Sequence, residues 1–471
     1  MMMGRKPPGP PPGLAALLLA LCLGLAACAS EPNLHQIFAE ARENAGPPEV
    51  VGARGPLSDA QAKAVLARLE KQAPGSDILQ RHLAIEQALA GTPLVAGNRT
   101  QILHTGTATF RAMFAAIEGA KDNVNLEYYT LEDIEVDGRH LGDLLLAKRA
   151  QGVKINIIYD SFGSLGTPSG FFDRLGKAGV KLLTFHPLNP FLAGLDYAPN
   201  DRDHRKILVV DGRTAIVGGV NLSTVYESAN PLARRGGKQP APDYWRDTDI
   251  EIQGPVVAEL QRLFLDTWAR QGGPPMDPAD YFPKLAPMGN QLVRIIGSSP
   301  AETVPHYYAT LLSAIHTAEK TVWLTTAYFV PTHAEMEDLE HAARRGVDVR
   351  LLLPGKSDSP SALAVGHSHY GDLLEAGVKI YETRNEILHS KTAVIDGVWS
   401  SVGSSNFDHR SVLFNNEVDA VVLGRETAAQ LEMVFQEDLK EATQINLEAW
   451  EDRPFSEKVQ EFLSRTWQTL L

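Results

Sequence analysis

Two stretches of this sequence share one pattern, HRKILVVDG at 204–212 and HSKTAVIDG at 389–397. Each begins with a histidine, has a lysine two residues later, and ends with Asp-Gly. Because residues i and i+2 of a β-strand point to the same face, each histidine should point the same way as its lysine. Asp-Gly is typical of a hairpin turn, so a return strand should follow each copy.

The shared pattern extends beyond these stretches, to His-x-Lys-x4-Asp-x6-Gly-x2-Asn. The return strand should bring the final asparagine back near the histidine. An imidazole beside an ammonium and a carboxamide suits phosphoryl transfer, in which the histidine attacks phosphorus or moves a proton. Lysine is rarely buried without a partner, so a half-buried lysine found twice points to a site. The pattern residues are His204, Lys206, Asp211, Gly218 and Asn221 in the first copy, and His389, Lys391, Asp396, Gly403 and Asn406 in the second.

The two aspartates of the pattern allow two interpretations. They could take part in the chemistry with the histidines and lysines. They could instead shape the turn and hold neighbouring backbone without contacting a substrate.

The copies lie in a long internal repeat. In each half, a helix that ends near a glycine precedes an aliphatic strand, which is the signature of α/β layering. The corresponding segments are 122–133, 144–160 and 175–183 in the first half, and 321–331, 339–354 and 373–381 in the second. We therefore expect two related α/β halves, joined by the Pro- and Gly-rich stretch 272–287.

The first 27 residues are typical of a bacterial secretory signal: Arg5 and Lys6 precede an apolar segment at 14–27 that is too short to span a bilayer. Its end, Leu-Ala-Ala-Cys28, resembles a lipoprotein cleavage site, which would make Cys28 the lipid-bearing first residue. The alternative is a plain signal peptide with a chance cysteine. The only other cysteine is Cys22, so the processed chain would have one thiol, and lipidation would explain it.

The net charge and the segments outside the repeat add further predictions. The net charge of −13, more negative still without the signal, argues against a general nucleic-acid binder. Residues 28–97 are predicted to be a helical N-terminal region, with a capping box at 58–61 and a second helix over 78–89. Residues 449–471 are predicted to be a C-terminal tail. His367 and His369 are interpreted as surface residues of a helix, not as metal ligands.

The two histidine-lysine copies resemble the paired HKD motifs of the phospholipase D superfamily, and the order of elements over residues 101–450 resembles its bacterial cardiolipin synthase branch. The resemblance implies an α/β fold of two similar halves, each a mixed sheet flanked by helices. The halves, 98–285 and 286–448, would be related by a pseudo-twofold axis with the active site between them. No metal or other cofactor is implied.

The resemblance also implies roles for individual residues. One histidine would form a covalent phosphohistidine, and the other would act on the leaving and entering alcohols. The nucleophile is expected to be His204, oriented by Asp247, with Glu417 orienting His389. A hydroxyl contact to phosphate is expected from Ser404 but not from the first half, which has Gly219 there. The implied catalytic residues are His204, Lys206, Asp211, His389, Lys391 and Asp396, and the implied phosphate-binding or supporting residues are Asn221, Asn406, Ser404, Asp247 and Glu417.

The predicted function is that of a phosphatidyltransferase of cardiolipin synthase type, which moves phosphatidyl from one phospholipid through a phosphohistidine to the hydroxyl of phosphatidylglycerol. Phosphatidylethanolamine is left open as a second donor. A phospholipase D hydrolase, a nuclease or other phosphodiesterase, and a non-catalytic lipid-binding protein are the alternatives. The expected location is periplasm-facing, with the protein anchored through lipid on Cys28 and the outer membrane favoured over the inner. The oligomeric state is left open.

Overall fold

The computed structural model describes residues 33–72, 78–189, 198–227, 244–465 and 468. The predicted signal segment and Cys28 lie outside these residues. Within the described ranges, none of the helices combines the length and the apolar character that a bilayer crossing requires.

Each half contains a mixed sheet with seven equivalent strands, which follow the same spatial order in both halves. The first three strands of each order are parallel and the remaining neighbours are antiparallel. The prediction of two similar α/β halves is therefore confirmed. The first sheet runs β8 (Lys181–Phe185), β7 (Lys154–Asp160), β4 (Asn123–Tyr128), β10 (Lys206–Val210), β11 (Thr214–Gly218), β13 (Asp249–Gln253) and β3 (Leu94–Leu103). The second runs β18 (Lys379–Thr383), β17 (Asp348–Pro354), β15 (Thr321–Thr325), β20 (Thr392–Ile395), β21 (Trp399–Gly403), β23 (Asn415–Leu423) and β14 (Gln291–Ser298), with β24 (Ala442–Gln444) beside β18.

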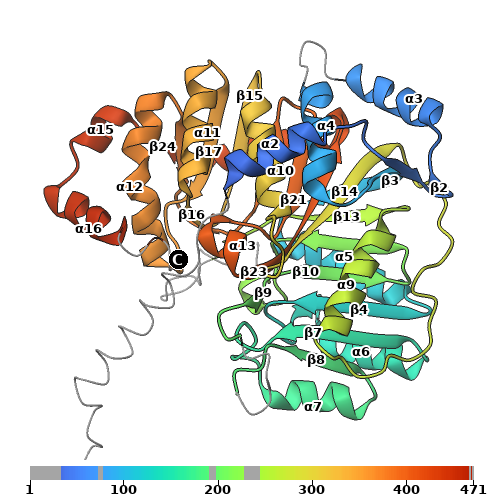
Figure 1. The fold of residues 1–471 in the computed structure, drawn as a ribbon. Helices are drawn as coiled ribbons and strands as arrows, with labels where there is room; N and C mark the ends of the chain where they lie inside the picture. Colours follow the sequence, from blue (N-terminus) through green and yellow to red (C-terminus); the bar gives the residue numbers. More distant parts are fainter. Residues whose placement is uncertain (1–32, 73–77, 190–197, 228–243, 466–467, 469–471) are drawn as a thin grey trace, which may run out of the picture.

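Helices flank the sheets at equivalent places in the two halves (Figure 1). In each half, one helix precedes each of the three parallel strands in the chain, and one long helix follows β13 or β23. Glycines with positive φ lie between a helix and the strand that follows it at four places, as the sequence predicted: Gly152, Gly179, Gly346 and Gly377. The helices are α5 (Gly106–Gly119), α6 (Leu141–Ala150), α7 (Ser169–Lys177) and α9 (Val257–Arg270) in the first half, and α10 (His306–Thr317), α11 (His333–Arg344), α12 (Pro360–Ala376) and α14 (Arg425–Lys440) in the second.

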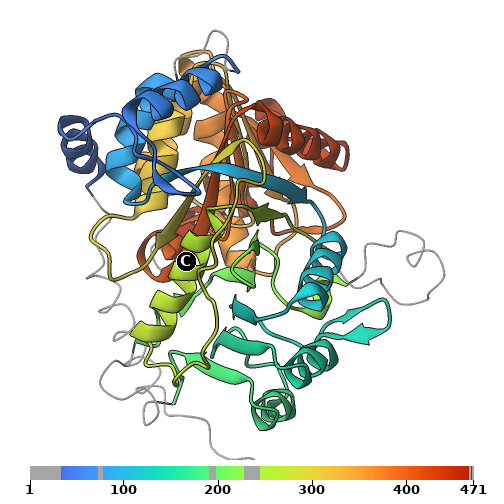
Figure 2. The same ribbon diagram turned by 90° about the vertical axis from the view of Figure 1, so that its right-hand side faces the viewer.

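Strand β3 belongs to both sheets. Its first residues pair with β14 of the second half, and its last residues pair with β13 of the first. Ile207 and Ile250 of the first half share one apolar core with Val293 and Val418 of the second, under α9 and α14. The first half therefore lies directly against the second, as the two lobes in Figures 1 and 2 show. Residues 272–287, the predicted joint, contain no helix or strand.

The N-terminal region packs on the second half, where its blue helices appear in both views (Figure 2). Ser58 caps the first predicted helix with the expected capping box. Buried Glu86 forms an ion pair with Arg294 and accepts a hydrogen bond from the indole of Trp399, which fixes the second helix on the sheet of the second half. The region also has strands that the sequence did not predict. Its elements are α2 (Leu34–Glu43), β1 (Val50–Gly52), β2 (Gly55–Pro56), α3 (Asp59–Glu70) and α4 (Ile78–Ala90).

The C-terminal segment forms two helices, α15 (Leu447–Glu451) and α16 (Phe455–Arg465), against α12. The interpretation of the two α12 histidines as surface residues is wrong in part. His369 is buried, because α16 covers it, and His367 Nε2 lies 2.8 Å from Glu382 Oε1. No group of three or more His, Cys, Asp or Glu side chains in the described ranges is placed to hold a metal ion. The remaining short elements are β5 (Glu135–Val136), β6 (Arg139–His140), η2 (Thr224–Tyr226), β16 (Phe329–Val330), β22 (Phe407–Asp408) and α13 (His409–Leu413).

Candidate active site

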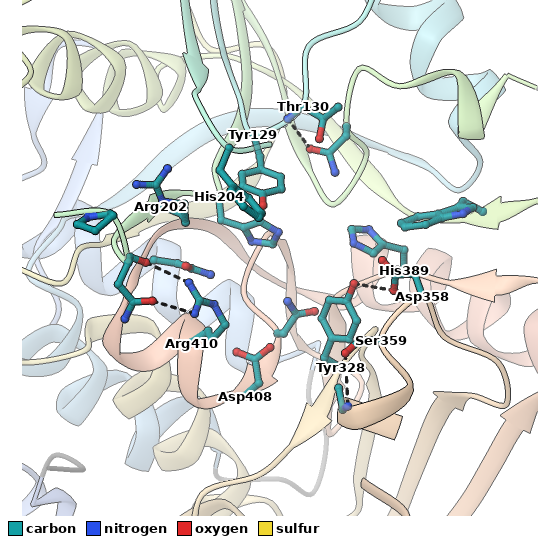
Figure 3. Close-up of a pocket in the computed structure, with 18 residues that line it drawn as sticks. Tyr129, Thr130, Arg202, His204, Tyr328, Asp358, Ser359, His389, Asp408 and Arg410 are labelled. Carbon is teal, nitrogen blue, oxygen red and sulfur yellow. Dashed lines mark hydrogen bonds between the residues drawn. The ribbon is translucent and has the colours of Figure 1, made fainter. Parts of the chain in front are cut away.

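Both predicted histidines line one pocket of about 560 Å³ between the two halves. Both predicted asparagines, Asn221 and Asn406, line it as well. Figure 3 shows His204 and His389 on either side of the pocket. The prediction that each return strand brings an asparagine back to its histidine therefore agrees with the structure.

Two short parallel ladders cross from one half to the other and place the histidines. Strand β9 (Arg202–Asp203) pairs with the start of β23, with Asp203 opposite Asn416. Strand β12 (Trp245–Arg246) pairs with β19 (Ile387–Leu388), with Arg246 opposite Leu388. In each ladder, the residue after the last pair is a histidine on one strand and a carboxylate residue on the other. The backbone N–H groups of the histidines continue the ladders: His204 donates to Asn416 O at 3.0 Å, and His389 donates to Arg246 O at 2.7 Å.

Each histidine consequently takes its carboxylate from the opposite half. His204 Nδ1 lies 3.0 Å from both carboxylate oxygens of Glu417. His389 Nδ1 lies 2.7 Å from Asp247 Oδ2. The expectation that Asp247 orients His204 and that Glu417 orients His389 is wrong, because the ladders pair the segment before each histidine with the other half. A carboxylate at Nδ1 holds the proton on that nitrogen, which leaves the lone pair of Nε2 for the pocket.

Several side-chain donors surround Glu417. Besides His204 it accepts bonds from Ser404 Oγ, from Ser411 Oγ at 2.9 Å and from Asn415 Nδ2 at 3.1 Å. Burial opposes its charge, but His204, Lys206 and Ser404 outweigh that effect and hold the pKa of Glu417 below its usual value. Glu417 is thus an ionised partner that stabilises positive charge on the ring of His204.

Ser404 does not have the expected contact with the phosphate site. Its hydroxyl is fully buried and donates to Glu417. In the first half, the corresponding Gly219 leaves room for the carboxylate of Asp247, because a Cβ on this glycine would overlap that carboxylate. Asp247 is held instead by the backbone N–H of Thr248 at 2.8 Å and by the hydroxyl of Tyr226 at 3.3 Å. The difference between the two copies is therefore a difference in how each carboxylate is supported.

The two predicted lysines lie behind the histidines and do not line the pocket wall. The ammonium of each donates to the carbonyl of the histidine two residues earlier. Burial lowers the pKa of Lys206 to about 7 and lowers that of Lys391. Burial also lowers the pKa of His204 and of His389 to about 4, so both rings are neutral near pH 7 in the free protein. A bound phosphate anion would raise all four pKa values, since it favours the charged form of each group.

The aspartates of the motifs lie at the far end of each hairpin from the histidines. Both have positive φ, 52° for Asp211 and 49° for Asp396, and a glycine with positive φ follows each, as a type I′ turn requires. Their implied catalytic role is not supported, because they shape the turn and hold neighbouring backbone. Asp211 accepts from the N–H groups of Lys121, Asp122 and Asn123, and Asp396 accepts from those of Glu319, Lys320 and Thr321.

Two further buried aspartates, which the sequence analysis missed, hold the loops of the asparagines. Asp249 lies opposite the motif glycine Gly218 and accepts from Val220 N at 3.0 Å. Asp419 lies opposite Gly403 and accepts from Ser405 Oγ. In both halves the carboxyl fills the space that a Cβ on the glycine would need. The signal was present in the sequence: each aspartate comes two residues after the carboxylate that contacts a histidine.

Aromatic and charged residues that no motif predicted complete the pocket. The ring of Tyr129 lies 5.4 Å from that of His204, and the rings of Tyr328 and Trp245 lie 6.1 Å and 5.0 Å from that of His389. Arg202 and Arg410 lie on the His204 side (Figure 3). Two guanidinium groups add positive charge to this end of the pocket, where an anionic group such as a phosphate can bind.

The comparisons with known proteins cover both halves. A family model described as "Cardiolipin synthase, PLD-like domain" matches residues 113–230 and 311–439. A cardiolipin synthase of Geobacillus kaustophilus is 35% identical over 382 residues, which are 80% of this chain and 74% of that protein. Cardiolipin synthase A of Pseudomonas putida is 35% identical over 366 residues, 77% of this chain and 73% of that protein.

A solved structure supports the fold. Phosphatidylserine synthase of Haemophilus influenzae superposes with a TM-score of 0.59 at 12% identity, over 82% of this chain and 96% of that one. The repeated sheet and the paired motifs are those of a phospholipase D-like enzyme. The chain belongs to the cardiolipin synthase-like branch of the phospholipase D superfamily and is a phosphatidyltransferase of that type.

Proposed function

We propose that the protein moves a phosphatidyl group from one phospholipid to the hydroxyl of phosphatidylglycerol and so forms cardiolipin. The observation that carries this proposal is the crosswise pairing, in which each histidine contacts a carboxylate of the opposite half through Nδ1: His204 contacts Glu417, and His389 contacts Asp247. Both histidines line the same pocket. One ring can attack phosphorus while the other moves the proton of an alcohol, which is the division of work that two-step transfer requires.

In the first step His204 Nε2 attacks the phosphorus of the donor lipid. Bound phosphate favours the charged form of His389, which takes up a proton from solvent at Nε2. The phosphorus–oxygen bond to the leaving alcohol breaks, and that oxygen takes this proton. In the second step the acceptor hydroxyl gives its proton to His389 and attacks the same phosphorus, and the phosphorus–nitrogen bond breaks. Ionised Glu417 supports the choice of His204 as nucleophile, because it stabilises the positive charge of a phosphorylated ring.

The cationic side chains around the pocket can neutralise the phosphate. Lys206 and Lys391 lie behind the histidines, and Arg202 and Arg410 line the wall. We therefore expect turnover to persist in a chelator such as EDTA. Loss of turnover in EDTA, restored by a divalent ion, would contradict this expectation.

The proposal is tested by incubating the purified protein with phosphatidylglycerol vesicles and identifying the lipid products. Cardiolipin with release of glycerol is the expected result. Phosphatidic acid as the sole lipid product, even at high lipid density, would favour the hydrolase alternative. Labelled phosphatidylethanolamine added to the same vesicles tests a second donor, and the His204→Ala/His389→Ala double variant is the control for background reaction.

We also propose that the protein is an exported lipoprotein, anchored through lipid on Cys28 and facing the periplasm, most simply at the outer membrane. The Leu-Ala-Ala-Cys boundary supports this placement. Cys28→Ala should leave the protein unprocessed or released from membranes, because firm anchoring needs more than one acyl chain. An unmodified N-terminus at another residue of the membrane-bound protein would refute it.

A further inference from the structure

A turn at the rim of the pocket exposes two large apolar side chains. Residues 161–167, which follow β7, form this rim turn. Phe162 is 54% exposed and Leu165 is 63% exposed, and Phe162 also lines the pocket. Two exposed apolar side chains in one short turn beside a ligand site form the kind of patch that marks an interaction surface.

The rim turn is held firmly. The carboxylate of Asp160 accepts from the N–H groups of Phe162 at 2.8 Å and Gly163 at 3.0 Å. Its other oxygen accepts from Asp203 N at 3.0 Å, which ties the turn to the residue before His204. The exposed side chains are therefore fixed relative to the nucleophile.

The inner side of the turn is anchored on the segment after β4. Ser164 Oγ donates to Tyr129 O at 3.1 Å and accepts from Leu131 N at 3.2 Å, and Thr167 Oγ1 donates to Leu131 O at 2.8 Å. Both anchoring side chains are buried, whereas the two apolar side chains are not. The turn thus buries its polar side chains and presents its apolar ones to the surroundings.

We propose that the rim turn inserts Phe162 and Leu165 into the surface of a phospholipid bilayer and so seats the mouth of the pocket on the membrane. This inference rests on the proposed function, since the substrate is then a lipid whose acyl chains stay in the bilayer while its phosphate reaches the histidines. The patch is continuous with that site through Phe162.

Charge also favours apolar insertion as the mode of contact. The chain has a net charge of −13, so an anionic bilayer repels it overall. Burial of exposed apolar area in the headgroup region can supply the contact in spite of this repulsion. Contact through the rim turn should accordingly change little between low and high salt.

The test compares Phe162→Asp, Leu165→Asp and the double variant, each in the chain of residues 29–471, which lacks both the apolar signal segment and the lipid-bearing Cys28. Sedimentation with vesicles of phosphatidylglycerol and phosphatidylethanolamine measures the partition coefficient. Each substitution should lower it about tenfold, from the loss of one inserted side chain. Met433→Asp is the matched control, because Met433 is 65% exposed on α14 and does not line the pocket.

A second readout separates membrane contact from catalysis. Leu165→Asp should lower kcat/KM on vesicles and leave kcat/KM on water-soluble dihexanoyl phosphatidylglycerol unchanged. Unchanged vesicle partition of the double variant, or an equal loss with Met433→Asp, would overturn the inference. A change in oligomeric state with unchanged partition would assign the patch to a protein contact and overturn it as well. Absence of turnover of the soluble lipid by the unsubstituted protein would instead refute the proposed function.

Discussion

The crosswise pairing of histidine and carboxylate can be tested on the covalent intermediate alone. In a His389→Ala background, a donor lipid with a good leaving group needs little acid assistance, so label should accumulate on His204. Adding Glu417→Gln removes the charged acceptor at 3.0 Å from His204 Nδ1. A hydrogen bond to a charged group contributes about 1.5–3 kcal/mol. Labelling of His204 should therefore slow by about tenfold to a hundredfold, at about 1.4 kcal/mol for each factor of ten.

Asp247→Asn in the same background is the matched control, and it should change the labelling rate little, because Asp247 contacts the other histidine at 2.7 Å. Quenched-flow mass spectrometry of the labelled peptide measures both rates, and thermal unfolding checks that each variant is folded. The opposite result, with Asp247→Asn blocking the label and Glu417→Gln silent, would refute the crosswise reasoning. Label on His389 in His204→Ala, and none in the converse variant, would exchange the roles of the two histidines.

Three further outcomes follow from the geometry. The profile of kcat against pH should be bell-shaped, falling at low pH as His204 gains a proton and at high pH as His389 loses the proton that it donates. Both limbs should lie above about pH 4, where burial places the pKa of each ring in the free protein, because bound phosphate favours the charged form of both. Asp396→Ala should lower the free energy of unfolding, measured in urea, by about 3 kcal/mol, because three hydrogen bonds from backbone N–H groups are lost and alanine is strained at a positive φ; kcat/KM should be nearly unchanged. Gly219→Ala should displace the carboxylate of Asp247 and slow steady-state transfer at least about tenfold, the effect of losing one charged hydrogen bond.

The fold was predictable because its signals are local. Helix ends at glycine, period-two strands and Asp-Gly turns each depend on a few neighbouring residues, and the repeat supplied every signal twice. The extent of the strands was less predictable. His389 was expected within its strand, but β20 begins at Thr392 because the backbone of His389 is engaged by the other half.

The partners of the histidines could not be predicted, because they depend on how the halves dock. Asp247 and Glu417 occupy equivalent places in the repeat, so no local feature distinguishes a partner in the same half from one in the other. The arginines are a different case. Counted from the motif histidine, Arg202 corresponds to Ile387, and counted from the motif asparagine, Arg410 corresponds to Val225. A search for duplicated residues therefore passes over both.

The two ladders that join β9 to β23 and β12 to β19 make the halves an isologous pair within one chain: each supplies to the other what it receives from it. Neither half has a complete catalytic centre alone, so the two cannot have diverged as independent enzymes after they were fused. Selection acts on their docking as a unit, since a substitution that rotates one half against the other disturbs both histidines at once. Two copies of the chain, each inactivated in a different half, should for the same reason fail to restore activity on mixing unless they exchange entire halves.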